Sequence, residues 1–258
     1  MRQSLLKYFV ELTGHPLASS TLKAFSQSRL SQPLIRPFIK AFGINTDEME
    51  YPISHYKNLH ALFTRRLAEN TRAIDQSPST IVSPVDGVIN DMGTIESDQT
   101  FYIKSQLYHL NDILGDKKRA KTYENGYFFI LYLSPKHYHR MHYPIDGALL
   151  SRYALGEKSF PVNNLGMRWG NKPFSTNYRI ISEVDTTYGQ VAIVKVGALN
   201  INSIGLTNTD TTLKKGDEIG YFSFGSTVIL LLEDNPAFKP CVKEGLDLQI
   251  GQPIGVWT

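Results

Sequence analysis

The sequence is poor in cysteine, has no long apolar run and carries little net charge. Its only cysteine, Cys241, excludes a disulfide framework within the chain, and such a low cysteine content fits a reducing compartment. No window reaches the roughly 18 to 20 apolar residues that a bilayer-spanning helix needs. The short apolar run in Met1 to Val10 has no small-residue cleavage site after it, so it does not predict a signal peptide. We expect a protein that is soluble or bound to a membrane surface.

The charge also argues against nucleic acid as a partner. The net charge is only +3, and no stretch is dense in Lys and Arg with interleaved aromatic residues. Hydrophobic residues make up 41% of the 258 residues, which is enough for a buried core and argues against disorder. A chain of this length fits one substantial domain with an appendage, or two small domains.

Residues 1–46 are predicted to be helical, because apolar residues recur there at helical spacing in three stretches. The apolar positions are Leu5, Leu6, Phe9, Val10 and Leu12, then Leu22, Phe25 and Leu30, then Leu34, Ile35, Phe38, Ile39 and Phe42. Gly43 is typical of a helix end. A further helix with its exit is predicted for residues 55–75, where the apolar stripe is Leu59, Leu62, Phe63 and Leu67.

The charge of residues 1–46 is one-sided, with six basic residues and one acid, Glu11. A basic, amphipathic helical segment with aromatic side chains suits the surface of an anionic bilayer. The same segment also fits an ordinary helical cap on the domain that follows. Taken alone, the segment leaves both interpretations open.

The rest of the sequence consists of short β-rich runs separated by Gly, Pro, Asn and Asp. The clearest runs are 127–133, 179–184, 190–196 and 227–232. We therefore predict an α+β chain with a helical region at residues 1–75 and a mostly β domain at residues 76–258. Gly-containing turns at 83–89, 213–220 and 245–255 resemble those of the barrel-sandwich folds of biotinyl and lipoyl carriers, a likeness of fold and not of function.

Gly225 and Ser226 stand at the entrance of an apolar run, Thr227 to Leu232, that is typical of a buried strand. Gly225 has no Cβ, so its carbonyl can be approached closely and its peptide unit can be strained. The Oγ of Ser226 could then attack the Gly225 carbonyl carbon in an N-to-O acyl shift. A plain turn at the start of a strand also explains these residues.

Three of the seven histidines, His137, His139 and His142, lie within six positions. On an extended backbone His137 and His139 point to one face and His142 points to the other. Such a cluster indicates a functional role more often than a lone histidine does. Asp86, in Ser83-Pro84-Val85-Asp86-Gly87, is a further candidate, although Asp before Gly is common in turns.

Together these motifs resemble the phosphatidylserine decarboxylase family. That family has an Asp-Gly turn early in its β domain, a Tyr-His-Arg-x-His-x-Pro segment in mid-chain and a Gly-Ser-Thr self-cleavage site near the C-terminus. All three occur here in that order. The likeness covers most of the chain from about residue 50 onward and includes residues 62–65, 72–75, 160–163 and 196–198. Phe224 departs from the Leu that bacterial members usually have before Gly-Ser-Thr, and both residues are apolar.

The resemblance implies a triad for self-processing, in which Asp86 orients His142 and His142 accepts the proton of Ser226. Cleavage between Gly225 and Ser226 would give a β chain of residues 1–225 and an α chain from residue 226, and the two chains would stay associated. Ser226 would become a pyruvoyl group, the electron sink for decarboxylating phosphatidylserine to phosphatidylethanolamine and CO₂. The resemblance assigns His139 as the proton donor and requires no metal. His137 lies outside the motif and is expected to cap or tune the strand end.

The same resemblance implies a lipid substrate and hence a place in the cell. Phosphatidylserine stays in the bilayer, so the N-terminal helices would dock the enzyme peripherally on the cytoplasmic face of the cell membrane. We further expect a homodimer and, from the low net charge, no nucleic acid partner.

Two other functions remain open from the residues. A zinc hydrolase could use His137, His139 or His142, with His109 or Asp86 completing the ligand set. A non-enzymatic barrel-sandwich carrier or phosphate-relay module would need an attachment lysine or a phosphorylatable histidine. A carrier would also leave the bond between residues 225 and 226 intact, whereas a zinc hydrolase would contain metal.

Overall fold

The computed structural model describes residues 16–103, 106–160, 162, 172–198, 203–223 and 225–258, with the side chains of residues 16–20 left aside. The predicted helical stretch from Leu5 to Leu12 lies outside the described residues. Phe224 and Asn163, which belong to the motifs quoted above, also lie outside them.

The described part of the N-terminal region is helical, as predicted. Its elements are α2 (Pro16–Gln27), the 3-10 helix η1 (Arg29–Leu34), α3 (Ile35–Phe42), the 3-10 helix η2 (Ile53–His55) and α4 (Leu59–Phe63). Helix α3 ends at Gly43, which has a left-handed φ of 66° and donates its N–H to the carbonyl of Ile39. The left-handed conformation suits glycine because it lacks a Cβ, so the predicted end of this helix is confirmed.

Helix α4 is shorter than the apolar stripe indicated. Asn58 caps its start by accepting the N–H of Ala61 at 2.8 Å, and the helix ends at Phe63. Arg65 then turns inward and is only 4% exposed. Its Nη2 donates to the carbonyls of Lys136 and His137, each at 3.1 Å. These bonds join the helical region to the histidine segment.

The remainder of the chain is mostly β. The strands are β1 (Thr80–Val82), β2 (Gly87–Thr94), β3 (Thr100–Ile103), β4 (Gln106–His109), β5 (Tyr127–Leu133), β6 (Arg140–His142), β7 (Gly147–Leu155), β8 (Arg179–Thr186), β9 (Gly189–Gly197), β10 (Ile204–Leu206), β11 (Thr212–Leu213), β12 (Glu218–Phe222), β13 (Ser226–Leu232), β14 (Phe238–Pro240), β15 (Asp247–Leu248) and β16 (Pro253–Trp257). The four strands predicted from apolar runs correspond to β5, β8, β9 and β13. The predicted α+β class with a mostly β domain is confirmed.

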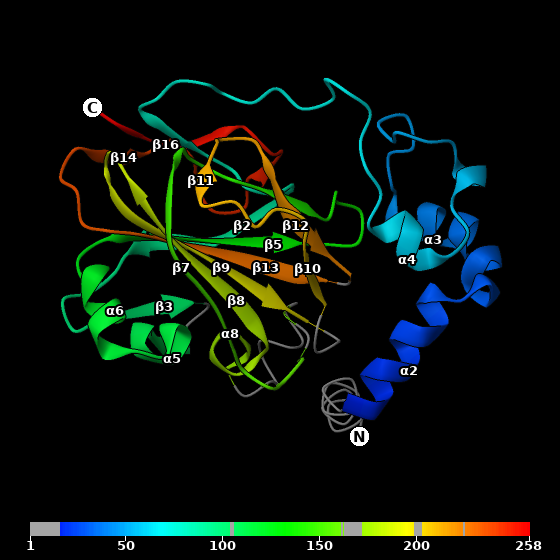
Figure 1. The fold of residues 1–258 in the computed structure, drawn as a ribbon, viewed down its shortest axis with the longest axis horizontal. Coiled ribbons are helices and arrows are strands. Elements are labelled where there is room, and N and C mark those ends of the chain that lie inside the picture. Colours follow the sequence, from blue (N-terminus) through cyan, green and yellow to red (C-terminus); the bar gives the residue numbers. More distant parts are fainter. Residues whose placement is uncertain (1–15, 104–105, 161, 163–171, 199–202, 224) are drawn as a thin grey trace.

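One large sheet organises this domain. Its strand order is β11-β7-β8-β9-β13-β5-β2-β15, and every neighbouring pair is antiparallel. Smaller sheets have the orders β1-β16-β14 and β10-β12-β6, and β3 pairs with β4. The short helices α5 (Leu110–Leu114), α6 (Lys117–Thr122) and α8 (Pro173–Thr176) complete the described elements and lie together with β3 on one side of the large sheet (Figure 1).

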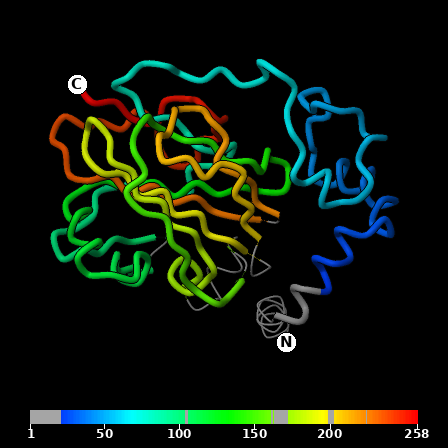
Figure 2. Tube along the Cα trace, viewed as in Figure 1, coloured from blue at the N-terminus to red at the C-terminus, as the bar shows by residue number. Residues whose placement is uncertain are grey.

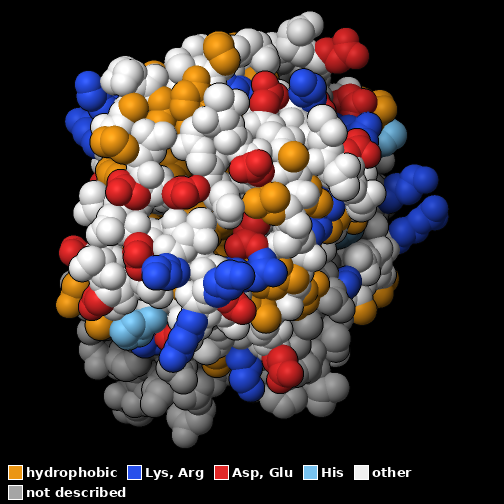
Figure 3. Space-filling model, turned by 60° about the vertical axis from the view of Figure 1, so that its left-hand side comes forward, with side chains coloured by type: hydrophobic (Ala, Val, Ile, Leu, Met, Phe, Trp, Pro, Cys, Tyr) orange, Lys and Arg blue, Asp and Glu red, His pale blue; other side chains and the backbone are white. Residues whose placement is uncertain are grey.

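The N-terminal helices stand at one end of the large sheet. In Figure 1, α3 and α4 lie beyond the end at which β5 finishes and β13 begins. The chain after α4 then runs along the edge of the molecule to reach β1, as the cyan tube in Figure 2 shows. On the face drawn in Figure 3, acidic and basic side chains are intermingled and hydrophobic side chains form only small groups.

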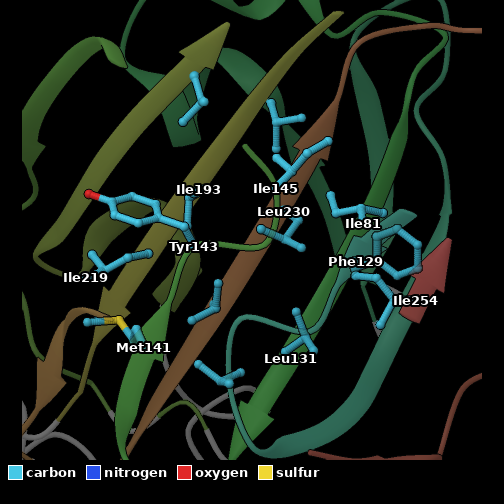
Figure 4. Close-up of a cluster of buried hydrophobic side chains, with 14 of the residues drawn as sticks. Ile81, Phe129, Leu131, Met141, Tyr143, Ile145, Ile193, Ile219, Leu230 and Ile254 are labelled. Atoms are coloured by element: carbon cyan, nitrogen blue, oxygen red, sulfur yellow. The ribbon is translucent and has the colours of Figure 1, made fainter. Parts of the chain in front are cut away.

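The two faces of the large sheet are buried in separate cores. Alternate residues of β13 belong to different clusters: Val228, Leu230 and Leu232 to one, Ile229 and Leu231 to the other. The first cluster is covered by the two three-stranded sheets, and Figure 4 shows Leu230 of the large sheet in the same cluster as Met141 and Ile219 of the covering strands. The second is covered by α5, α6 and the β3–β4 pair. Strand β13 is therefore buried on both faces and paired along both edges.

Candidate active site

Two of the predicted site residues, Ser226 and Asp86, lie near the same end of the large sheet. Ser226 is the first residue of β13, opposite Leu133 on one side and Gly197 on the other. Asp86 directly precedes β2, whose start pairs with the end of β5. Two strand spacings of about 4.8 Å separate β2 from β13. Gly87 must be glycine here, since a Cβ would lie 2.8 Å from the carbonyl oxygen of Tyr132.

The cleavage site predicted from the sequence combines a buried hydroxyl with an open glycine. Ser226 is 0% exposed, and its Oγ has no hydrogen-bond partner among the described residues. Gly225 is half-buried and has no atom within 4 Å of the place that a Cβ would take. A buried polar group without a partner is unusual and points to a functional role.

Gly225 lines a cavity of about 650 Å³, which we call the apolar groove. The groove runs between the N-terminal helices and the end of the large sheet. Its lining is Leu22, Phe25, Ser26, Leu34, Phe38, Phe42, Leu59, His60, Phe63, Tyr132, Pro135, Val162, Ala198, Ser223 and Gly225. Among these, Leu22, Phe25, Leu34 and Phe42 are each at least 40% exposed. An apolar surface this open is typical of a site that binds a hydrophobic partner.

His139 lies one side chain away from the apolar groove. Its ring centroid is 3.8 Å from that of Phe63, which lines the groove together with Gly225. His139 is 0% exposed, and its Nδ1 lies 2.9 Å from the carbonyl oxygen of His137. Because a carbonyl only accepts, Nδ1 carries the proton and Nε2 keeps a free lone pair, without a partner among the described residues. Burial, and then the charge of Arg65, holds the pKa of His139 well below its usual value, so the ring is neutral.

His142 lies in a different cavity. It lines a space of about 200 Å³ together with Arg72, Tyr138, Gly216 and Ile250 among others. The Nδ1 of His142 donates to the carbonyl of Gly216 at 2.7 Å, and its Nε2 is 3.5 Å from the hydroxyl of Tyr138. Burial lowers the pKa of His142. The imidazole is therefore neutral with its lone pair on Nε2, the form that can act as a base.

Asp86 is engaged elsewhere than the resemblance implied. Its carboxylate accepts two hydrogen bonds from Arg72, at 2.6 and 3.1 Å, and one from the backbone N–H of Ile250 at 2.9 Å. The group that orients the His142 ring is the Gly216 carbonyl, in place of the Asp86 carboxylate. Asp86 instead fixes Arg72 and Ile250, which form part of the wall around His142.

His137 has the structural surroundings of a strand cap. Its Nδ1 accepts the N–H of Ser134, the first residue after β5, at 2.9 Å. Its Nε2 lies 3.2 Å from the carboxylate of Asp247. Within the described ranges, no three His, Cys, Asp or Glu side chains are grouped so that they could hold a metal ion. Nor does any helix of the described chain have the length and apolarity to cross a bilayer.

The sequence did not reveal the partners that shape these sites. Arg65 and Arg72 belong to segments that resemble the family, but the sequence does not show that they bond to positions 136 and 137 and to Asp86. The presence of an arginine in a sequence does not indicate whether its side chain will be buried and hydrogen-bonded to a distant segment. The sequence predicts Gly216 as a turn residue, but nothing in it indicates that the Gly216 carbonyl accepts a hydrogen bond from His142.

Comparison with known proteins identifies the family. The sequence profile described as phosphatidylserine decarboxylase matches residues 59–256. The phosphatidylserine decarboxylase proenzyme of Geobacillus kaustophilus is 47% identical over 258 residues, covering 100% of this chain and 98% of the relative. The proenzymes of Halalkalibacterium halodurans and Bacillus mycoides are 43% and 48% identical, over 100% and 98% of this chain and 99% and 95% of their own lengths. The chain belongs to the phosphatidylserine decarboxylase family.

A solved structure of glucose permease IIA from Mycoplasma capricolum is also matched, at a TM-score of 0.36 and 14% identity. The match covers 69% of this chain and 95% of that one. A likeness at this TM-score carries no conclusion about the present chain.

Proposed function

We propose that this protein is a self-processing, pyruvoyl-dependent decarboxylase that converts phosphatidylserine to phosphatidylethanolamine and CO₂. The observation that carries the proposal is the unpartnered, fully buried Oγ of Ser226 beside the open Gly225, at the wall of a groove suited to lipid. Family membership supports the same reaction.

Self-cleavage begins at the bond between Gly225 and Ser226. The Oγ of Ser226 attacks the Gly225 carbonyl carbon, and a neutral histidine accepts the hydroxyl proton. We assign this task to His142, in keeping with the family motif, because its Nε2 carries the lone pair. The amide then rearranges to an ester, and elimination from the ester releases the Gly225 carboxylate. Elimination leaves a dehydroalanine at position 226, which tautomerises to an imine, and addition of water with loss of ammonia yields the pyruvoyl group.

The residues around position 226 fit that group. The pyruvoyl ketone would form at the former Cα of residue 226, with its oxygen in the place of the backbone nitrogen, at the start of a strand held on both sides. When present, the group supplies a ketone that withdraws electrons from the bond to the departing carboxylate. We assign to His139 the proton transfer to the product carbon, since its Nε2 has no partner among the described residues and its ring contacts Phe63 of the groove. The ring is neutral at rest, so Nε2 takes up a proton before it donates one, and the depressed pKa makes that protonated ring a strong acid.

Strand β13 supports the continued association of the β and α chains. All seven of its residues are buried, and each is paired with both β5 and β9. Removing this strand would expose Val228 to Leu232 to water, which costs roughly 1.5–3 kcal/mol for each such side chain.

The apolar groove is proposed to hold the acyl chains of the lipid, with the head group directed to Gly225. Its outer wall is formed by α2, η1 and α3, whose exposed apolar residues are the proposed membrane contact. We further propose that the protein binds peripherally to the cytoplasmic face of the cell membrane and forms a homodimer. We also propose that residues 1–75 are a helical, membrane-associating region and residues 76–258 the catalytic domain. Light scattering on the mature protein tests the homodimer.

Replacing two exposed apolar residues by acids is expected to weaken membrane binding. Phe25 is 40% and Leu30 77% exposed, so Phe25→Glu with Leu30→Glu removes contact area and adds repulsion from an anionic bilayer. We expect at least about tenfold weaker co-sedimentation with phosphatidylserine vesicles, since tenfold corresponds to about 1.4 kcal/mol. Point substitutions test this better than deletion of residues 1–40, because Ser31 and Ile35 are buried in the helical region.

The matched control for this experiment is Gln27→Glu with Gln32→Glu. Both glutamines are exposed in the same segment, so this variant adds the same two charges without removing apolar contacts. Equal losses in the two variants would mean that charge alone governs binding and would contradict docking through the apolar face.

Intact mass spectrometry under denaturing conditions tests the proposed function. The wild-type protein is expected to give two fragments separated between residues 225 and 226, the smaller with a blocked N-terminus. A vesicle assay should then show CO₂ release from phosphatidylserine. A preparation that decarboxylates phosphatidylserine as a single uncut chain would overturn the proposal.

A further inference from the structure

Ser203 is a second buried hydroxyl without a partner. Its side chain is 0% exposed, and its Oγ has no hydrogen-bond partner among the described residues. The same is true of Ser226. Leaving a buried hydroxyl unpaired costs stability, so two of them at one place indicate a use other than holding the fold.

The sheet register places Ser203 beside Ser226. Ser226 and Gly197 are directly opposite each other on β13 and β9. Opposite residues of an antiparallel pair share a face, as Leu230 and Ile193 do further along the same strands (Figure 4). The Oγ of Ser203 occupies the space that a Cβ of residue 197 would fill. Opposite Cβ atoms of an antiparallel pair are close neighbours, so the hydroxyl of Ser203, beside the place of a Cβ on residue 197, faces the side chain of Ser226.

The backbone of Ser203 is also tied to the approach to the cleavage site. Its carbonyl accepts the N–H of Ser223 at 2.7 Å. The next residues, Ile204 and Phe222, pair as the first step of the β10–β12 ladder. Ser203 is thus held in register with the segment that leads to Gly225, and the absence of a side chain at Gly197 leaves room for its hydroxyl.

We propose that the Ser203 hydroxyl donates a hydrogen bond to the Oγ of Ser226 during the elimination step of self-cleavage, an inference that rests on the proposed function. After the acyl shift, this Oγ is the ester oxygen between the Gly225 carbonyl carbon and the Ser226 Cβ. A base removes the Cα proton of Ser226, and the double bond between Cα and Cβ forms. The Cβ–Oγ bond breaks, and its electron pair leaves with the Gly225 carboxylate.

A donor at this position favours the elimination because negative charge grows on Oγ as the bond breaks. The hydrogen bond strengthens toward the transition state and so accelerates this step more than the acyl shift. No oxidant or additional reactant is required. Ser203 would therefore contact a reacting atom and act as a catalytic residue of maturation.

Ser203→Ala tests the inference through the ester that precedes elimination. Freshly translated full-length protein is sampled over time by denaturing mass spectrometry, with and without hydroxylamine. We expect formation of the blocked fragment from residue 226 to slow by about 100-fold, the scale seen when one donor to a developing oxyanion is removed. The ester should accumulate, and hydroxylamine should release a fragment with an ordinary serine N-terminus, heavier than the blocked one by one ammonia.

Ser159→Ala is the matched control. Ser159 is also 0% exposed, its Oγ is likewise unpaired among the described residues, and it lies outside the self-cleavage motif. This variant is expected to mature at the wild-type rate. Ser203→Cys retains a weaker donor of similar size and is expected to mature at an intermediate rate, with some ester accumulation.

The outcomes separate the inference from the proposed function. Wild-type maturation of Ser203→Ala, or slow maturation without a hydroxylamine-sensitive ester, overturns the role of Ser203 alone. An uncut wild-type protein overturns the proposed function instead. Should Ser203→Ala not fold, as judged by circular dichroism, Ser203→Cys decides: ester accumulation supports the inference, and the wild-type rate without ester overturns it.

Discussion

Ser226→Ala is expected to remain one uncut chain without decarboxylase activity. The substitution removes the only atom that can attack the Gly225 carbonyl carbon and the only source of the proposed pyruvoyl group. Folding should be nearly unchanged, because the Oγ of Ser226 makes no hydrogen bond with the described residues that the alanine would lose. Removing an unpaired buried hydroxyl is neutral or slightly stabilising. The measurements are intact mass, thermal unfolding and CO₂ release from phosphatidylserine vesicles.

Ser159→Ala is the control for that experiment. Ser159 is also 0% exposed, and its Oγ is likewise unpaired among the described residues. It should mature and decarboxylate like the wild type, so an effect confined to Ser226→Ala cannot be attributed to the loss of any buried hydroxyl. Decarboxylation by the uncut Ser226→Ala chain would refute the proposed chemistry.

The second large effect is expected from a matched pair of histidine variants. In His139→Asn and in His142→Asn, the amide N–H₂ can replace Nδ1–H as the donor to the carbonyl of His137 or Gly216. Each variant therefore keeps the orienting hydrogen bond and loses only the Nε2 lone pair. His139→Asn should mature but lose about 10²- to 10⁴-fold in the rate of decarboxylation, the usual contribution of a general acid or base. His142→Asn should instead mature slowly.

The pH dependence gives an independent check on His142. A base acts in its neutral form, and burial lowers the pKa of this histidine below the ordinary 6.5. The maturation rate of the wild type should therefore stay level as the pH falls to 6.5 and decline only in more acidic buffer. A decline centred above pH 6.5 would contradict His142 as the base. If His139→Asn blocked maturation and His142→Asn did not, the two assignments would be reversed.

The sequence was informative where burial is continuous along the chain. The apolar runs of β5 and β13 mark strands covered on both faces, and their predicted bounds differ from the observed ones by at most one residue. Helices α5, α6 and α8 were not foreseen, because each has only four to six residues and too few turns to show a helical period.

The arrangement of the candidate site could be predicted only in part. The motifs named Asp86, His139, His142 and Ser226, but they contain no record of contacts between distant segments. The pairing of Asp86 with Arg72 and the cap that Gly216 provides for His142 depend on how the helical region and the turn after β11 fold back. Ser203 follows residues 199–202 in a stretch without periodicity, and only the close approach of its hydroxyl to Gly197 draws attention to it.

The burial of β13 bears on whether the two proposed fragments can be exchanged between molecules. The fragment that starts at Ser226 also provides β14 and β16, which build a sheet with β1, and β15, which edges the large sheet beside β2. It is interwoven with the other fragment at several separate places, so exchange of fragments between molecules would require global unfolding. On the proposed cleavage, each molecule would work for its lifetime with the reactive end it made for itself, and a damaged end would be replaced only by new synthesis.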